Sequence, residues 1–239
     1  MLAIPGFFNF LIPARCLHCR VMVTADYSLC GPCFCQLVFL EGRQCNRCGR
    51  PFVDQEGQIG QHICGACILN PPLYQQTRSA ILYDQHSKKL ILSFKHYDRI
   101  DFVQLFTKWL MATGKDIIPF TDVIIPVPLH WRRLMARQYN QAGLLAAAVS
   151  QQSKRPLLLR GLRRKRATLS QGKMTARQRR LNVQHVFVVP KKYDESIFQK
   201  NILLIDDVMT TGATVAACTK ALLQAGARSV YVLVVARVG

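Results

Sequence analysis

The chain has 239 residues, half of them hydrophobic, and a formal net charge of +19 at pH 7. This length and composition exclude a wholly disordered protein and suffice for one well-cored domain of about 150 residues plus a smaller module. The positive surplus favours polyanionic partners such as nucleic acid, an acidic membrane face or a polyphosphate. No apolar stretch reaches the roughly eighteen residues that a membrane span needs, and the start of the chain is unlike a signal peptide. We therefore expect no membrane span and a cytoplasmic location.

The first predicted unit, residues 1–72, is rich in cysteine. Nine of the ten cysteines lie before residue 68, and eight form four Cys-x-x-Cys pairs: Cys16/Cys19, Cys30/Cys33, Cys45/Cys48 and Cys64/Cys67. Two thiolates three residues apart can bind one tetrahedral metal ion, and two such pairs complete its four ligands. A segment of this size buries little core, so metal binding would supply folding free energy. We expect a double zinc-binding module with two structural Zn²⁺ ions, closed and non-catalytic.

Alternative interpretations of the cysteines remain open at this stage. Disulfides are disfavoured because no secretion signal precedes them, and a redox pair is disfavoured by the fourfold repetition. Sequential grouping of the pairs is the simplest choice, but a cross-braced grouping is not excluded by the spacing. Cys35, His18 or His62 could replace a thiolate, although we expect them to be bystanders. Cys218, in a predicted helix, is expected to be a small core residue.

The second predicted unit, residues 73–239, follows the rigid boundary Asn70-Pro71-Pro72 and alternates strands with helices. Strands are expected at 79–83, 122–127, 186–189, 202–205 and 230–235, and helices at 87–97, 101–113, 138–151 and 213–225. This alternation predicts an α/β fold with a doubly wound, mostly parallel sheet covered on both faces. Ligands of such sheets bind at the carboxyl ends of the strands.

The strand at 202–205 leads into the strongest functional signal. It is followed by Asp206 and Asp207 and then by a phosphate cradle of hydroxyls, a glycine and the free N–H groups of a starting helix: Thr210, Thr211, Gly212, Ala213 and Thr214. The carboxylates can accept hydrogen bonds from two vicinal hydroxyls, provided that the phosphate lies beyond them. The pattern therefore suits a sugar whose 5′-phosphate occupies the loop.

The segment 202–214 closely resembles the phosphoribosyl-pyrophosphate motif of type I phosphoribosyltransferases. The resemblance extends along the chain to the ComF/GntX family of competence-associated proteins, through the Cys-x-x-Cys pairs, residues 124–130, residues 137–142 and residues 162–182. It implies a type I phosphoribosyltransferase-like fold and a phosphoribosyl-pyrophosphate ligand with Mg²⁺. It also implies that Arg132, Arg133 and Arg137 contact pyrophosphate and that Asp206, Asp207 and Arg166 serve catalysis. Gln138 stands where relatives usually have glycine, and Asn140 with Gln141 could instead cap a helix.

The positive charge is concentrated in the middle of the chain. Between Val123 and Tyr193 there are sixteen Lys and Arg and no acid. By the resemblance, residues 163–182 form a loop that closes over pyrophosphate, whereas an ordinary solvated basic surface is the simpler alternative. One phosphoribosyl pyrophosphate carries far less charge than this stretch can neutralise, which leaves an excess for a DNA backbone. Candidate nucleic-acid contacts are Arg163, Arg164, Lys165, Arg166, Lys173, Arg177 and Arg180.

Three functions follow as hypotheses. The first is a ComF-like protein that binds phosphoribosyl pyrophosphate and single-stranded DNA, and acts in DNA uptake with the uptake machinery as a possible partner. The second is a phosphoribosyltransferase that transfers ribose 5-phosphate to an unknown nitrogen acceptor and releases pyrophosphate. The third, transcriptional control by sensing phosphoribosyl pyrophosphate, ranks last because it needs an oligomer and a defined DNA element.

Overall fold

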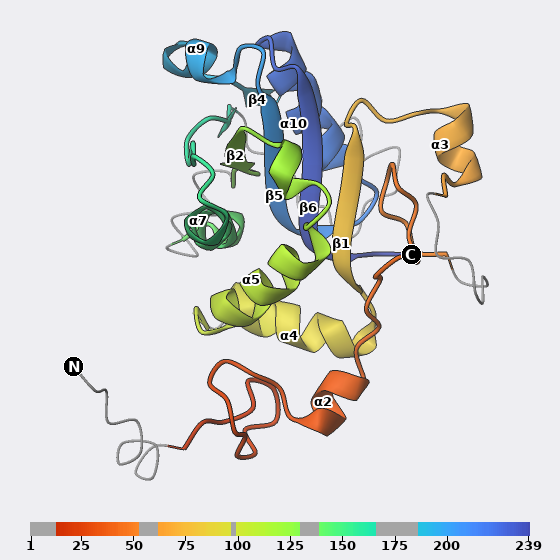
Figure 1. The fold of residues 1–239 in the computed structure, drawn as a ribbon, viewed down its shortest axis with the longest axis vertical. Coiled ribbons are helices and arrows are strands. Elements are labelled where there is room, and N and C mark those ends of the chain that lie inside the picture. Colours follow the sequence, from red (N-terminus) through yellow and green to blue (C-terminus); the bar gives the residue numbers. More distant parts are fainter. Residues whose placement is uncertain (1–12, 53–61, 97–98, 130–138, 166–185) are drawn as a thin grey trace.

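The computed structural model describes residues 13–52, 62–96, 99–129, 139–165 and 186–239. Its centre is a four-stranded sheet in the order β1-β6-β5-β2, in which every pairing is parallel (Figure 1). The strands are β1 (Gln76–Leu82), β2 (Val123–Pro126), β5 (Asn201–Met209) and β6 (Ser229–Arg237). Leu157 adds a single parallel bridge to Ile124 at the outer side of β2. The expected α/β class with a mostly parallel sheet is confirmed.

Two apolar clusters cover the two faces of this sheet. One joins inward side chains of the sheet to α4 (Gln85–His96), α5 (Phe102–Thr113) and α7 (Gln141–Ser153). The other lies under α10 (Ala213–Gln224) and the antiparallel pair of β3 (Arg163–Arg164) and β4 (Phe187–Val188). Successive residues of β5 divide between the clusters, as alternation along a strand requires. Cys218 is fully buried in the second cluster, as predicted.

Local sequence signals explain where the helices begin and end. The Asp84 carboxylate accepts hydrogen bonds from the N–H groups of His86 and Ser87, while the Ser87 hydroxyl accepts one from the Asp84 N–H. This reciprocal arrangement satisfies N–H groups that the first turn of α4 leaves free. The short elements are η1 (Ile118–Phe120), η3 (Lys191–Tyr193) and α9 (Asp194–Ile197).

The cysteine-rich segment packs against the sheet layer at two separate places (Figure 1). Its first part, with α2 (Gly31–Cys35), lies beside α4, where the Gln36 amide oxygen is 3.1 Å from Nδ1 of His86. Its second part, with α3 (Gly65–Leu69), lies beside β1 and the end of β6. Between them, the Leu40 N–H bonds to Ala80 and the Leu82 N–H bonds to Val38, so residues 38–40 pair with β1.

Several boundaries differ from the sequence-based expectation. β5 runs to Met209, four residues beyond its predicted end, because β6 continues beside it as far as Arg237. Asp206 and Asp207 are therefore the last part of a strand rather than the start of a loop. β4 has only two residues and pairs with β3 in a separate antiparallel two-stranded sheet outside the main sheet. Within the described residues, no helix is long and apolar enough to cross a membrane.

Candidate functional site

The predicted cradle lies at the carboxyl end of β5, where α10 begins. Gly212 is the residue before the helix and has φ 77°, a left-handed conformation that side chains disfavour. The Thr211 hydroxyl accepts the N–H of Ala213 at 3.4 Å, and the Ala216 N–H bonds to Gly212. Thr211 is exposed while Gly212 and Ala213 are buried. The loop is thus built as a helix N-terminus open to solvent at Thr211, which is an arrangement that binds anions.

Arg237, the last residue of β6, forms hydrogen bonds with the backbone carbonyls at the start of this loop. It is 4% exposed, and its Nη1 donates to the carbonyls of Met209 at 3.2 Å, of Val238 at 2.8 Å and of Thr210. In a trans peptide the C=O and the following N–H point in opposite directions. Because the Met209 and Thr210 carbonyls face Arg237, the N–H groups of Thr210 and Thr211 face away from it. Arg237 therefore orients backbone donors toward the space in front of the loop.

The two carboxylates before the loop differ in environment. Asp207 forms an ion pair with Lys95 of α4, with 2.9 Å between Oδ2 and Nζ. Burial, followed by the charge of Asp207, raises the pKa of Asp206 to about 8, while Lys95 acts in the opposite direction. Asp206 is therefore largely protonated at neutral pH when no ligand is bound. In such a pair, the ionised carboxylate of Asp207 can accept hydrogen bonds from hydroxyl groups while the carboxyl of Asp206 holds a proton.

The end of β2 lies directly beside these acids. The Val127 N–H bonds to the Ile205 carbonyl, so the expected pyrophosphate turn begins next to Asp206. Asn140 is the N-cap residue immediately before α7, but its side chain makes no capping bond and donates instead to the Val127 carbonyl at 3.1 Å. The Gln141 amide, almost fully buried, donates to the carbonyl of Lys95. These amides tie the turn after β2, α7 and the end of α4 together.

The eight paired cysteines come together in two groups of four: Cys16, Cys19, Cys30 and Cys33, then Cys45, Cys48, Cys64 and Cys67. Within each group the four sulfur atoms lie within 4.8 Å of one another. Tetrahedral zinc with Zn–S bonds of about 2.3 Å requires sulfur atoms about 3.8 Å apart. The Sγ atoms of Cys19 and Cys30 are 3.5 Å apart, and those of Cys48 and Cys64 are 3.7 Å apart. The thiols thus fit one ion per group in the sequential grouping.

The two groups repeat the same local geometry. Cys30 donates its N–H to the Cys16 sulfur at 3.3 Å, and Cys64 donates to the Cys45 sulfur at the same distance. The fourth residue after the first cysteine, Arg20 or Gly49, has positive φ in each case. The Cys48 thiol and several backbone N–H groups donate to the Cys45 sulfur, which lowers the pKa of Cys45 and raises the pKa of Cys48. N–H donation to sulfur favours the thiolate that zinc requires.

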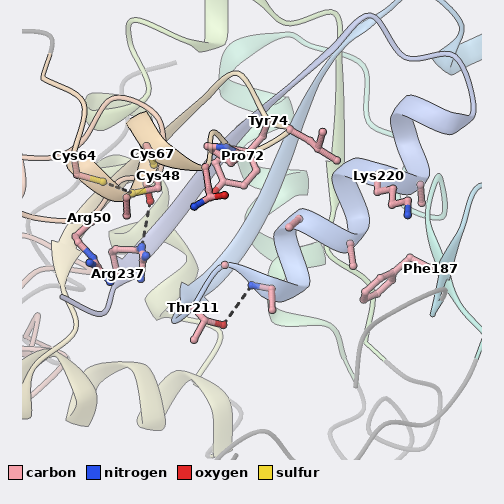
Figure 2. Close-up of a pocket in the computed structure, with 18 of the residues that line it drawn as sticks. Cys48, Arg50, Cys64, Cys67, Pro72, Tyr74, Phe187, Thr211, Lys220 and Arg237 are labelled. Carbon is pink, nitrogen blue, oxygen red and sulfur yellow. Dashed lines mark hydrogen bonds between the residues drawn. The ribbon is translucent and has the colours of Figure 1, made fainter. Parts of the chain in front are cut away.

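A cavity of about 1040 Å³ adjoins the cradle (Figure 2). One wall is the second cysteine group with residues 69–74, the floor is one side of α10, and the opposite wall is Lys165 with β4. Thr211, Gly212 and Ala213 line the end nearest the cradle. Arg237 connects the cradle to the second cysteine group, because its Nε donates to the Cys48 carbonyl at 3.2 Å. The second cysteine group is thus part of the site's wall, whereas the first group does not contribute to it.

The structure places only part of the predicted basic set. Arg163 is exposed on β3, and the Arg164 guanidinium lies 5.6 Å from the ring centre of Phe187. Lys165 is exposed at the cavity. The remaining predicted contacts lie outside the described residues: Arg132, Arg133, Arg137, Arg166, Lys173, Arg177 and Arg180.

Two residues of the site were missed by sequence reasoning, Lys95 and Arg237. Arg237 carried a usable signal, because it ends an apolar strand at the same edge of the parallel sheet as Asp206. Lys95 carried none, because only the packing of α4 brings it to β5.

These features define a class: an α/β protein with a phosphate-type loop at the carboxyl edge of a parallel sheet, preceded by two four-cysteine metal sites. The sequence profile of the double zinc ribbon domain matches residues 7–68. The two four-cysteine groups fit that domain, and we call them the first and second ribbon sites.

Whole-chain comparisons extend the match. The chain is 30% identical to "Competence protein F" of Haemophilus influenzae over 238 residues, 97% of this chain and 99% of the relative. It is 28% identical to "DNA utilization protein YhgH" of Escherichia coli O157:H7, covering 92% of this chain and 96% of that protein. It is 29% identical to "Competence protein ComFC" of Bacillus subtilis, covering 86% and 82%. The chain belongs to the competence protein F family.

Two solved structures show partial similarity to this chain. One is described as the allosteric regulatory enzyme of purine biosynthesis, with TM-score 0.40 and 17% identity, covering 60% of this chain and 30% of that one. Another is orotate phosphoribosyltransferase from Aeropyrum pernix, with TM-score 0.35 and 14% identity, covering 66% and 79%.

Proposed function

We propose that this protein binds phosphoribosyl pyrophosphate and single-stranded DNA and acts in the uptake or utilisation of DNA. The observation that carries the proposal is the continuous unit of β5, loop and α10, with Asp206 and Asp207 on one side of the cradle and Thr210–Thr214 in it. A ribose over the carboxylates and a 5′-phosphate at the helix start would use both features. The names of the relatives, which refer to competence and DNA utilisation, support the DNA role.

Charge supports the same assignment. Phosphoribosyl pyrophosphate is a polyanion, and Mg²⁺ would accompany it because phosphates and carboxylates are the ligands that Mg²⁺ prefers. Lys95 adds a positive charge next to Asp207. The acid-free basic stretch between Val123 and Tyr193 supplies more charge than one such ligand needs, which suits a DNA backbone. Zinc thiolates require reduced cysteines, so we place the protein in the cytoplasm, within reach of the uptake machinery.

Calorimetry tests the ligand. We expect wild-type protein to bind phosphoribosyl pyrophosphate with Mg²⁺, and the double variant Asp206→Asn, Asp207→Asn to lose at least about tenfold in affinity because hydroxyl acceptors weaken. Glu195→Gln, an exposed acid on α9, is the matched control and should bind as wild type does. Equal affinities for all three proteins would contradict the assignment of the site.

The alternative of a phosphoribosyltransferase is favoured by the cavity beside the cradle, which offers room for an acceptor. Pyrophosphate release should be measured with phosphoribosyl pyrophosphate and a panel of bases, amines and DNA. Release with one acceptor would establish a transferase. Binding without release would leave a ligand-binding module.

A further inference from the structure

The cavity beside the cradle extends much further than a sugar phosphate requires. Besides Thr211 at one end, it is lined along α10 by Ala216, Lys220 and Gln224, so it runs nearly the whole length of that helix. Its volume of about 1040 Å³ is at the upper limit of the roughly 300–1,000 Å³ that small-molecule sites occupy. We call it the α10 groove. A ligand that fills it must continue beyond the cradle.

The charge of the groove points to a polyanion. Among the described residues that line it, four are cations, Arg50, Lys165, Lys220 and Arg237, and none is an acid. A zinc ion with four thiolates carries a net charge of about −2, and Arg50 and Arg237 lie beside the second ribbon site and offset it (Figure 2). Lys165 and Lys220 then provide the positive charge that remains unbalanced in the groove. Lys165 lies on the wall opposite the second ribbon site, and Lys220 lies on the floor. Both are exposed and so can reach phosphates.

Between these cations, most of the lining side chains are small or apolar. Alanines 213, 216, 217 and 221 form the floor, and Leu69 and Leu73, 80% and 58% exposed, stand on the rim. Tyr74 and Phe187 line the groove but are 4% and 7% exposed, so neither offers a ring face on which a base could stack. Recognition in the groove would therefore rest on phosphates and apolar contact and would be poor in sequence preference.

We propose that the α10 groove is the path of single-stranded DNA, entering the cradle through a backbone phosphate. This inference rests on the proposed function. A backbone phosphate would use only the N–H and hydroxyl donors of the cradle and not Asp206 and Asp207, because an internal deoxyribose has no free vicinal hydroxyls, and the cradle opens at exposed Thr211 into the groove. The strand continues along α10 between Lys165 and Lys220. Free phosphoribosyl pyrophosphate and DNA then compete for one phosphate position.

Fluorescence anisotropy with a labelled oligothymidylate of about 20 nucleotides tests the path. Lys220→Glu should weaken binding about fivefold, and Lys220→Ala should lower the salt slope by about 0.7 because one phosphate contact is lost. The matched control is Lys200→Glu, which makes the same charge change on an exposed residue at the amino end of β5. Its effect should be much smaller.

A second pair of variants replaces alanine by the larger leucine, either in the groove or away from it, and leaves the charge unchanged. Ala217→Leu narrows the floor of the groove and should also weaken DNA binding, whereas Ala147→Leu, at an exposed position of α7, should not. All of these variants should bind phosphoribosyl pyrophosphate with wild-type affinity, since none touches the cradle. Excess phosphoribosyl pyrophosphate should displace the oligonucleotide from wild-type protein.

The outcomes separate this inference from the proposed function. Equal DNA affinities for Lys220→Glu and Lys200→Glu, or simultaneous and independent binding of both ligands, would overturn the groove assignment and leave the cavity as an acceptor pocket. Absence of phosphoribosyl-pyrophosphate binding to the wild-type protein would instead contradict the proposed function itself.

Discussion

Asp206 is a residue whose protonation the fold changes strongly. Its carboxyl is buried next to a second carboxylate, and its pKa of about 8 compares with an ordinary value of 3.8. The folded protein therefore keeps a proton that the unfolded chain has released. Stability falls as pH rises wherever the folded state binds more protons, so the free energy of unfolding should decrease between about pH 4 and pH 8 and then level off.

Asp206→Asn removes this titration while keeping the shape of the side chain. We expect the variant to melt at a higher temperature than the wild type, with a gap that widens from about pH 5 to about pH 8. Thermal unfolding of both proteins without ligand, at several pH values, measures this difference in melting temperature. Glu195→Gln is the control, and a gap that does not depend on pH would contradict the assignment.

Lys95 is the second residue with a specific expectation. Without its ammonium group, Asp207 loses the cation that pairs with it, and an anionic ligand loses a favourable charge. Lys95→Met should weaken phosphoribosyl-pyrophosphate binding about tenfold, since hydrogen bonds involving charged groups contribute about 1.5–3 kcal/mol. Lys95→Arg should retain most of the affinity because it restores the charge. Calorimetry compares the two, and equal losses would show that the charge of Lys95 is irrelevant.

At the scale of elements, β6 is more than a strand of the core. Its last residue, Arg237, donates to the carbonyls of Met209 and Thr210 at the start of the cradle and to the carbonyl of Cys48 in the second ribbon site. A lysine at this position keeps the charge but cannot serve several acceptors with a planar fork.

Arg237→Lys should therefore lower the melting temperature and weaken phosphoribosyl-pyrophosphate binding, while zinc content stays at two ions per chain. Each buried carbonyl left without a donor costs about 1–3 kcal/mol. Arg228→Lys, an exposed arginine just before β6, is the control. Thermal unfolding, calorimetry and metal analysis together check the expectation, which fails if the cradle binds its ligand unchanged.

The sequence predicts the elements that are continuous along the chain. The β5–loop–α10 unit can be read directly, because its carboxylates, glycine and threonines follow one another, and the cysteine groups follow from spacing alone. Residues brought together by packing could not be read in the same way. The ion pair of Lys95 with Asp207 joins segments 112 positions apart in the chain, and the Cys48–Arg237 bond spans 189 positions. The extension of β5 to Met209 likewise depends on a partner strand.

At the scale of the whole molecule, the two ribbon sites have different neighbours. The first lies beside α4, and the second forms a wall of the α10 groove. Cys16→Ser and Cys45→Ser should each leave one zinc per chain by metal analysis. Both should lose stability, because zinc binding supplies folding free energy.

Ligand binding should distinguish these two variants. Cys45→Ser should weaken phosphoribosyl-pyrophosphate binding far more than Cys16→Ser, because only the second site is bonded through Arg237 to the cradle in the described part of the chain. Cys35→Ser is the control and should keep two zinc ions and wild-type affinity. Equal losses of phosphoribosyl-pyrophosphate affinity in Cys16→Ser and Cys45→Ser would contradict a coupling between the second ribbon site and the cradle.

The segment between the ribbons has a further consequence, for self-association. Residues 38–40 pair with β1, which is the outermost strand of the sheet on that side. An uncovered outer strand presents unpaired N–H and C=O groups to other molecules, and natural proteins usually protect it. Here the protecting segment is anchored at both ends by metal sites. Chelation would free it, so metal-depleted protein should aggregate through β1 even while the core of the sheet remains folded.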